Sequence, residues 1–220
     1  MSRATAANIR QVEIPAFGRR LHADLSIPEN AVGLVLFAHG SGSSRLSPRN
    51  RFVAAELQAG GIATLLMDLL TADEEREDEI TTEFRFDIGL LAERLMAASE
   101  WAAGQDDTAH LPLGYFGAST GGGAALVAAA LWPKGVAAVV SRGGRPDLAG
   151  DALPRVRAPT LLIVGGNDPQ VIELNRQAMA ELRCKKQLQI IPGATHLFEE
   201  PGTLEEVARL AREWFAEHFV

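Results

Sequence analysis

Short apolar runs recur along the chain, and polar or amphipathic segments separate them. Runs at residues 32–38, 62–67, 113–116, 136–140 and 160–164 are apolar almost throughout. This pattern is typical of strands buried on both faces of a parallel sheet. A less apolar run at 187–191 completes the series as the last predicted strand.

The N-terminal part shows a different period. Residues 9–15 and 19–27 predict two antiparallel strands joined near Gly18. Leu21, Ala23 and Leu25 alternate with polar neighbours, which indicates a strand that is half exposed.

Helical patterns fill most of the gaps between the apolar runs. They predict helices at 49–59, near 83–103, after residue 124, near 170–182 and at 203–218. Repeated strand-helix units after an antiparallel hairpin indicate an α/β fold with a doubly wound, mostly parallel sheet and helices on both faces. With 220 residues, the chain is expected to form one domain over 1–220.

Charge and cysteine content narrow the function classes. The net charge is −7, and a run of six acids interrupted only by Arg76, at 73–79, carries most of it. We expect this run to be a solvated surface loop. No basic stripe is present, so nucleic acid is not expected as a partner. The single cysteine, Cys184, excludes an intramolecular disulfide.

Targeting and membrane signals are also missing from the sequence pattern. The N-terminus lacks a charged-then-apolar signal, and no apolar run approaches the roughly 20 residues that a membrane span needs. We therefore expect a cytoplasmic protein with no membrane partner. A homodimer through the last strand or helix fits the pattern, although no residue argues for it.

The segment from Gly117 to Gly121 carries the strongest chemical signal. Gly117, Ser119 and Gly121 fit G-x-S-x-G between a predicted strand and an alanine-rich helical run. Such a turn strains the serine backbone and lifts its hydroxyl clear of the sheet, at a helix N-terminus. The competing interpretation is an ordinary helix cap.

Two further strand ends supply partners for this serine. Strand 160–164 leads to Asp168, and strand 187–191 leads to His196. A neutral histidine can take the serine proton, and an aspartate can fix the histidine tautomer. Asp168 precedes Pro169 and would otherwise cap the next helix. The order predicts a catalytic triad of Ser119, Asp168 and His196.

An oxyanion needs N–H donors aimed at it. The N–H of Thr120, just after the serine, is one candidate. The second is expected from the loop after His39, from Ser41 or alternatively from Gly42. His39 itself is expected to pack or hydrogen-bond beneath this loop.

With these residues in this order, the chain resembles the α/β-hydrolase superfamily over nearly its whole length. Its short length and plain layout are similar to the dienelactone hydrolase-like branch, although dienelactone hydrolases proper use a cysteine where this chain has Ser119. The resemblance implies hydrolysis of a small ester or lactone through an acyl-enzyme. Lactone specificity is not carried over.

The link from Ser141 to Pro159 has nineteen residues, too few for a helical lid domain. Its second residue, Arg142, is a candidate for substrate contact that would otherwise pair with an acid such as Asp147. Gly42, in the loop after His39, and Arg45, which follows that segment, are further candidates. No zinc-type spacing or dinucleotide fingerprint is present, so neither metal nor cofactor is expected.

Three functions remain open on this pattern. The first is a serine hydrolase of small esters or lactones. The second is an acyltransferase or perhydrolase that uses the same triad with another acyl acceptor. The third is a non-catalytic binding protein on a hydrolase scaffold.

Overall fold

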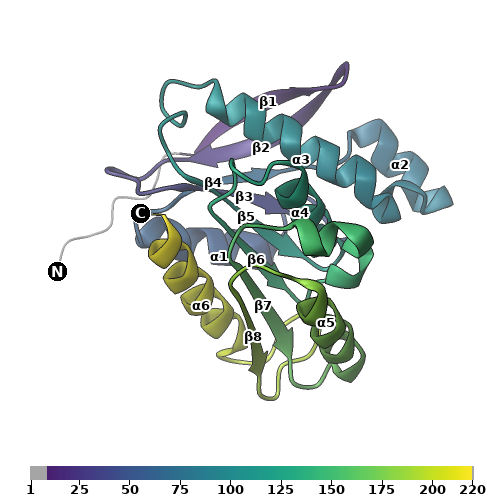
Figure 1. The fold of residues 1–220 in the computed structure, drawn as a ribbon. Coiled ribbons are helices and arrows are strands. Elements are labelled where there is room, and N and C mark those ends of the chain that lie inside the picture. Colours follow the sequence, from purple (N-terminus) through teal and green to yellow (C-terminus); the bar gives the residue numbers. More distant parts are fainter. Residues whose placement is uncertain (1–8, 220) are drawn as a thin grey trace.

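A computed structural model describes residues 9–219, in which a single twisted sheet separates two layers of helices (Figure 1). Within these residues the sheet has eight strands in the order β1-β2-β4-β3-β5-β6-β7-β8. The strands are β1 (Ile9–Ala16), β2 (Arg19–Ser26), β3 (Leu34–Ala38), β4 (Ala63–Met67), β5 (Leu113–Ala118), β6 (Ala138–Arg142), β7 (Thr160–Gly165) and β8 (Lys186–Ile191).

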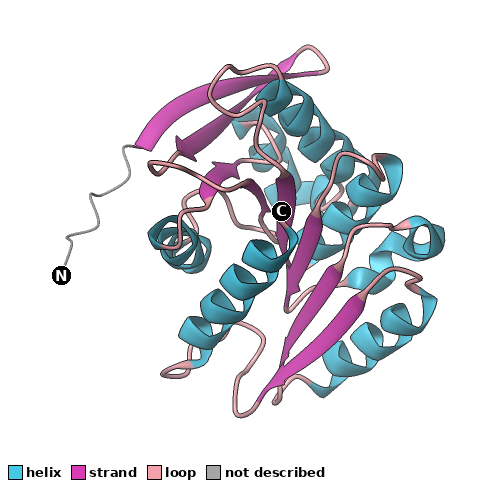
Figure 2. Cartoon of the chain, turned by 60° about the vertical axis from the view of Figure 1, so that its left-hand side comes forward, coloured by secondary structure: helices cyan, strands magenta, loops and turns pink. Residues whose placement is uncertain are grey.

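The helices divide between the two faces. Helices α1 and α6 pack together on one face, and α3, α4 and α5 cover the other (Figures 1 and 2). The α-helices are α1 (Pro48–Ala59), α2 (Ala72–Thr81), α3 (Ile88–Ala103), α4 (Thr120–Leu131), α5 (Pro169–Glu181) and α6 (Thr203–His218). Two 3₁₀ segments, η1 (Phe84–Phe86) and η2 (Pro146–Arg155), accompany them.

The apolar runs form strands because both faces of the sheet are covered. Every residue of β3, β4, β5, β6 and β7 is buried. Two hydrophobic clusters result, one under α3 and α4 and one under α1 and α6. The sequence-based fold class is therefore confirmed, including the antiparallel N-terminal hairpin and the absence of a lid domain within the described residues.

The sheet topology gathers the chemically interesting residues. β2 runs antiparallel to β4, whereas β4, β3, β5, β6, β7 and β8 pair in parallel. Ligands on such sheets bind beyond the carboxyl ends of the parallel strands. The loops after β3, β5, β7 and β8 therefore lie along one edge.

The acidic run at 73–79 is not a surface loop, which corrects the sequence-based expectation. It forms α2, and Thr71 and Glu74 build a reciprocal capping box at its start. Glu74 and Asp78 are buried, and they pair with Arg94 and Arg85. Arginines from α3 and η1 thus offset charges that the sequence alone suggested were solvated.

Other boundaries also shift. The helix predicted near 83–103 begins at Ile88, because Asp87 accepts a hydrogen bond from the N–H of Leu90 at 3.0 Å and η1 occupies residues 84–86. The helix after the serine starts at Thr120 rather than at residue 124. The link between β6 and β7 contains η2, which the sequence pattern did not indicate.

None of the helices described within residues 9–219 combines the length and the apolar character required to traverse a bilayer.

Candidate active site

Ser119 lies in the sharp turn between β5 and α4. Its backbone has φ 51° and ψ −122°, in a region that non-glycine residues seldom occupy. The turn is fixed by hydrogen bonds from the N–H groups of Gly122 and Arg145 to the Ser119 carbonyl, both at 2.9 Å. Although Ser119 occupies the N-cap position of α4, its side chain makes no capping hydrogen bond. The capping interpretation of this serine therefore finds no support.

The glycines around Ser119 are required by close backbone packing. A Cβ at Gly117 would collide with the backbone of Gly121, and one at Gly121 would collide with the carbonyls of Ala38 and His39. The G-x-S-x-G pattern thus reflects a turn pressed between two neighbouring strands.

Asp168 and His196 meet across the ends of β7 and β8. The His196 Nδ1 and the Asp168 Oδ2 lie 2.7 Å apart, so the carboxylate accepts the Nδ1 hydrogen and leaves Nε2 as the free nitrogen. Asp168 sits at the N-cap of α5, yet its side chain makes no capping bond there. Its hydrogen bond is directed to the imidazole instead.

A hydrogen bond within the loop that carries His196 stabilises it. The Glu200 carboxylate accepts a hydrogen bond from the N–H of Thr195 at 3.1 Å. This contact holds the residue next to His196 in place.

His39 lies beneath the loop that follows β3. Its Nε2 accepts a hydrogen bond from the N–H of Leu69 at 3.0 Å, so Nδ1 carries the hydrogen donated to the Gly40 carbonyl, also at 3.0 Å. Burial lowers the pKa of His39, which favours this neutral form, and the contacts with Gly40 and Asp68 oppose the shift only in part. His39 therefore hydrogen-bonds beneath the loop and supports it, as the sequence predicted.

The two residues predicted to form the oxyanion hole are adjacent. The hydroxyls of Ser41 and Thr120 lie 3.2 Å apart, although the residues come from the ends of different strands. A Cβ at Gly40 would lie 2.9 Å from the Cβ of Ser119, which shows how closely this loop approaches the serine.

A cavity of about 190 Å³ opens over Ser119 and His196. Arg142 from the end of β6 lines it, together with Arg49 and Asn50 from the first turn of α1. Ser119 and His196 therefore line one small cavity, whose lining also includes two arginines.

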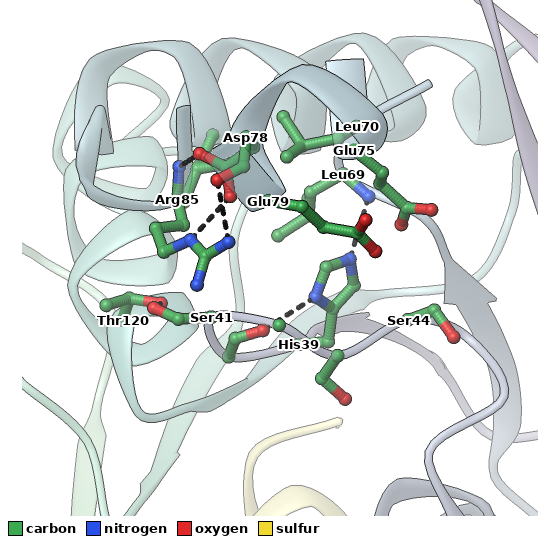
Figure 3. A pocket seen from close by; sticks show the side chains of 14 residues that line it. His39, Ser41, Ser44, Leu69, Leu70, Glu75, Asp78, Glu79, Arg85 and Thr120 are labelled. Atoms are coloured by element: carbon green, nitrogen blue, oxygen red, sulfur yellow. Dashed lines mark hydrogen bonds and ion pairs between the residues drawn. The ribbon is translucent and has the colours of Figure 1, made fainter. Parts of the chain in front are cut away.

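A second cavity, of about 230 Å³, lies between the same loop and α2 (Figure 3). It shares Gly40 and Ser41 with the first cavity, and α2 contributes Glu75 and Glu79. Figure 3 shows these two side chains above His39, while the Arg85 guanidinium is bonded to Asp78. The lining of this cavity is acidic.

The three candidates for substrate contact lie in different places. Arg142 lines the cavity of Ser119 and makes no ion pair with Asp147, which Arg145 engages at 2.7 Å instead. The Arg45 side chain binds Asp68 and lies 3.5 Å from Asp24, and it is not among the residues that line that cavity. Gly42, with φ +64°, lines the acidic cavity.

Sequence reasoning missed the contributions of α1 and α2. Arg49 and Asn50 enter the site because Ser47 caps a helix that starts immediately after the oxyanion loop, with Pro48 at its first position. A serine followed by proline is a known helix-start signal. That signal places the first turn of α1 at the edge of the sheet where Ser119 and His196 lie.

No group of three or more histidine, cysteine, aspartate or glutamate side chains within the described part of the chain is arranged to hold a metal ion.

Comparison with known proteins identifies relatives that match nearly the whole chain. A model described as the dienelactone hydrolase family matches residues 21–218. The crystal structure of a dienelactone hydrolase from Anabaena variabilis is 59% identical, with a TM-score of 0.95, and the match covers 97% of this chain and 99% of that one.

A more distant structure shares the fold. Est1E from Butyrivibrio proteoclasticus is 19% identical, with a TM-score of 0.79 over 94% of this chain and 98% of its own. The eight-stranded sheet and its helical layers therefore form an α/β-hydrolase fold.

Two Mycobacterium tuberculosis proteins, from strains CDC 1551 and H37Rv, are each 60% identical over 208 residues. Their names describe candidate phosphoribosyl transferases. The match covers 94% of this chain but 46% of each relative, so the chain spans about half the length of these curated relatives.

Proposed function

Because the chain belongs to the dienelactone hydrolase family, we propose that it is a serine hydrolase that cleaves small carboxylic esters or lactones through an acyl-enzyme. The observation that carries the proposal is the 2.7 Å contact between His196 and Asp168 in a site whose cavity also contains the strained Ser119. Neither Ser119 nor Asp168 uses its side chain to cap the helix that it precedes, which leaves both groups for chemistry.

In the first half of the reaction, the Ser119 Oγ attacks the substrate carbonyl carbon while the Nε2 of His196 takes its proton. The carbonyl π electrons move to oxygen, and the N–H groups of Thr120 and Ser41 stabilise the resulting oxyanion. The tetrahedral intermediate collapses, and the alcohol leaves with the proton from His196. Asp168 keeps the imidazole in the required tautomer and stabilises its charged form.

In the second half, water attacks the acyl-enzyme and passes its proton to His196. The intermediate collapses, the carboxylic acid departs, and the proton returns to Ser119. If another nucleophile, such as an alcohol or hydrogen peroxide, takes the place of water, the same steps give acyl transfer or perhydrolysis.

Phosphoribosyl transfer is not part of the proposal. The relatives whose names suggest it are more than twice the length of the matched segment, and the family match over residues 21–218 is to hydrolases. We propose a small-molecule substrate and no nucleic-acid or membrane partner.

The direct test is intact-mass spectrometry after treatment with a fluorophosphonate, on the wild type and on Ser119→Ala. We expect one stoichiometric adduct on the wild type and none on the variant. A folded wild type that takes up no adduct would overturn the proposal and favour a non-catalytic scaffold. If labelling succeeds, product analysis with hydroxylamine or hydrogen peroxide present separates hydrolysis from acyl transfer.

A further inference from the structure

Arg142 is a buried guanidinium without a counter-ion. The residue is only 6% exposed, and its Nε has no hydrogen-bond partner. Its Nη2 donates to the Asn50 Oδ1 over a long 3.4 Å, and the guanidinium carbon lies 5.8 Å from the centre of the Phe198 ring. Among residues 9–219, no carboxylate forms an ion pair with it.

This arrangement is costly unless something else neutralises the charge. Burial lowers the pKa of Arg142 to about 10, and the nearby Arg49 adds to the shift. The group therefore remains protonated at neutral pH. Buried charges in proteins are normally paired or bound to a ligand, because an isolated ion loses its hydration without compensation.

The position of Arg142 indicates what the missing partner is. The residue lines the cavity of about 190 Å³ that contains Ser119 and His196. Arg49 enters the same cavity and is held by Glu199 over 3.4 Å, a contact whose carboxylate is mostly exposed to solvent. Two arginines and Asn50 thus line the cavity that contains the predicted nucleophile.

The second cavity, of about 230 Å³, has more acidic than basic side chains in its lining. Glu75 and Glu79 line that cavity (Figure 3), and burial raises the pKa of Glu75, with the charge of Asp68 as the next cause. An anionic group is disfavoured there and favoured at Arg142. The charge difference between the two cavities would orient a substrate that has one anionic end.

We infer that Arg142, supported by Arg49 and Asn50, forms an anion subsite, and that the substrate carries a carboxylate or phosphate group bound there. The inference rests on the proposed hydrolase function and specifies its substrate class. The Arg142 Nη2, whose contact with Asn50 is long, supplies a charged N–H donor of the kind that guanidinium groups offer to carboxylate and phosphate oxygens.

The test compares matched esters with and without the anion. Monomethyl adipate and methyl hexanoate differ mainly in a terminal carboxylate, and proton release follows their hydrolysis. For a carboxylate-binding subsite, Arg142→Gln should lower kcat/KM for the adipate about 10- to 100-fold, mainly through KM, because the charge-assisted hydrogen bond to the carboxylate is lost. Hydrolysis of the hexanoate should change less than about threefold, in line with an interaction that does not touch the reacting atoms.

A second pair distinguishes the source of the anion. 2-Acetoxyethyl phosphate carries a phosphate on its alcohol, and 2-methoxyethyl acetate is its uncharged counterpart. Selective loss of activity on the acetoxyethyl phosphate in Arg142→Gln would assign a phosphate on the leaving group. Selective loss on the adipate would assign a carboxylate on the acyl group.

Arg209→Gln is the matched control. It removes the same charge from α6, where Glu206 and Glu213 already neutralise the guanidinium, and Arg209 lines neither cavity. This variant should hydrolyse all four esters like the wild type. Arg142→Lys keeps the charge without the guanidinium donors, and it should show an intermediate loss on the anionic ester.

A labelling measurement tests the anion subsite without any ester substrate. Inorganic phosphate or adipate should slow the labelling of Ser119 by an uncharged fluorophosphonate in the wild type, and Arg142→Lys should weaken this protection severalfold. Labelling that proceeds at the same rate with and without these anions, or equal losses on charged and neutral esters, would overturn the subsite while leaving the hydrolase proposal intact. A wild type that cannot be labelled at all would instead overturn the hydrolase proposal, and the subsite with it.

Discussion

The Asp168 carboxylate accepts a hydrogen bond from the Nδ1 of His196 at 2.7 Å, rather than capping the helix that it precedes. The Asp168 side chain is 16% exposed and the imidazole is 40% exposed, so the pair joins a shielded anion to an imidazole that solvent can reach. This relationship separates a catalytic role for Asp168 from a structural one, because the two roles predict different effects of a conservative substitution.

Replacing Asp168 with Asn should reduce kcat for a small ester about 10⁴-fold, because the amide no longer holds the imidazole in the required tautomer. The Asp168 side chain makes no capping hydrogen bond and asparagine has nearly the same shape, so the thermal midpoint should change little. Steady-state kinetics and thermal unfolding of the same samples check both expectations. If activity falls only a few-fold, another acid must orient His196.

The strained backbone of Ser119 predicts an unusual stability effect. At φ 51° and ψ −122° a side chain costs roughly 1–3 kcal/mol, whereas glycine adopts such angles freely. Ser119→Gly should therefore be more stable than Ser119→Ala by about 1 kcal/mol, despite the roughly 0.4–1 kcal/mol entropic cost of glycine in the unfolded chain. Urea unfolding of the two inactive variants measures the difference.

The same pair of substitutions at Ser43 provides the control, since Ser43 does not have a positive φ. There glycine should be the less stable of the two. If glycine is also less stable than alanine at position 119, the turn is not strained in solution.

The sequence predicted those parts of the fold and site that depend on local pattern. Apolar runs marked the buried strands, and the residues just after them included Ser119, Asp168 and His196, because parallel strands end at one edge. The surroundings of Arg142 could not be predicted in this way. Asn50 and Phe198 reach it from α1 and from the loop after β8, and no local pattern encodes that approach.

The buried His39 predicts a pH dependence of stability. Burial lowers its pKa in the folded protein below the ordinary value of 6.5. As pH falls through 6.5, the unfolded chain binds a proton that the folded protein still excludes, so the free energy of unfolding decreases towards the lower folded pKa. The stability advantage of the wild type over His39→Gln should therefore be largest above pH 7 and should narrow as pH falls to 5.

Unfolding curves of both proteins at several pH values test this. His110→Gln, a change at an exposed histidine, controls for the loss of an imidazole as such. An advantage that stays constant would mean that folding leaves the pKa of His39 unchanged, and one that widens in acid would mean that folding raises it.

Helix α2 could not be predicted from the charge of its residues alone. The run at 73–79 contains no apolar stripe, so its charge suggested solvent exposure. The signal that identifies the helix is the Thr71-x-x-Glu74 capping box, followed by acids in the first turn where the helix dipole favours them. Its buried acids are stabilised by arginines distant in sequence, which composition cannot reveal.

Glu74 is therefore expected to matter far more than its acidic neighbours. It accepts hydrogen bonds from the guanidinium of Arg94 at 2.9 Å and from the N–H of Thr71 at 2.8 Å, and both charged side chains are nearly inaccessible. Glu74→Ala leaves Arg94 buried without its partner, and breaking such a pair typically costs about 3–5 kcal/mol. Asp73→Ala, one residue earlier on the exposed side of the same first turn, should have little effect. Equal unfolding midpoints in urea for the two variants would contradict this account, because they would show that the buried acid contributes no more than the solvated one.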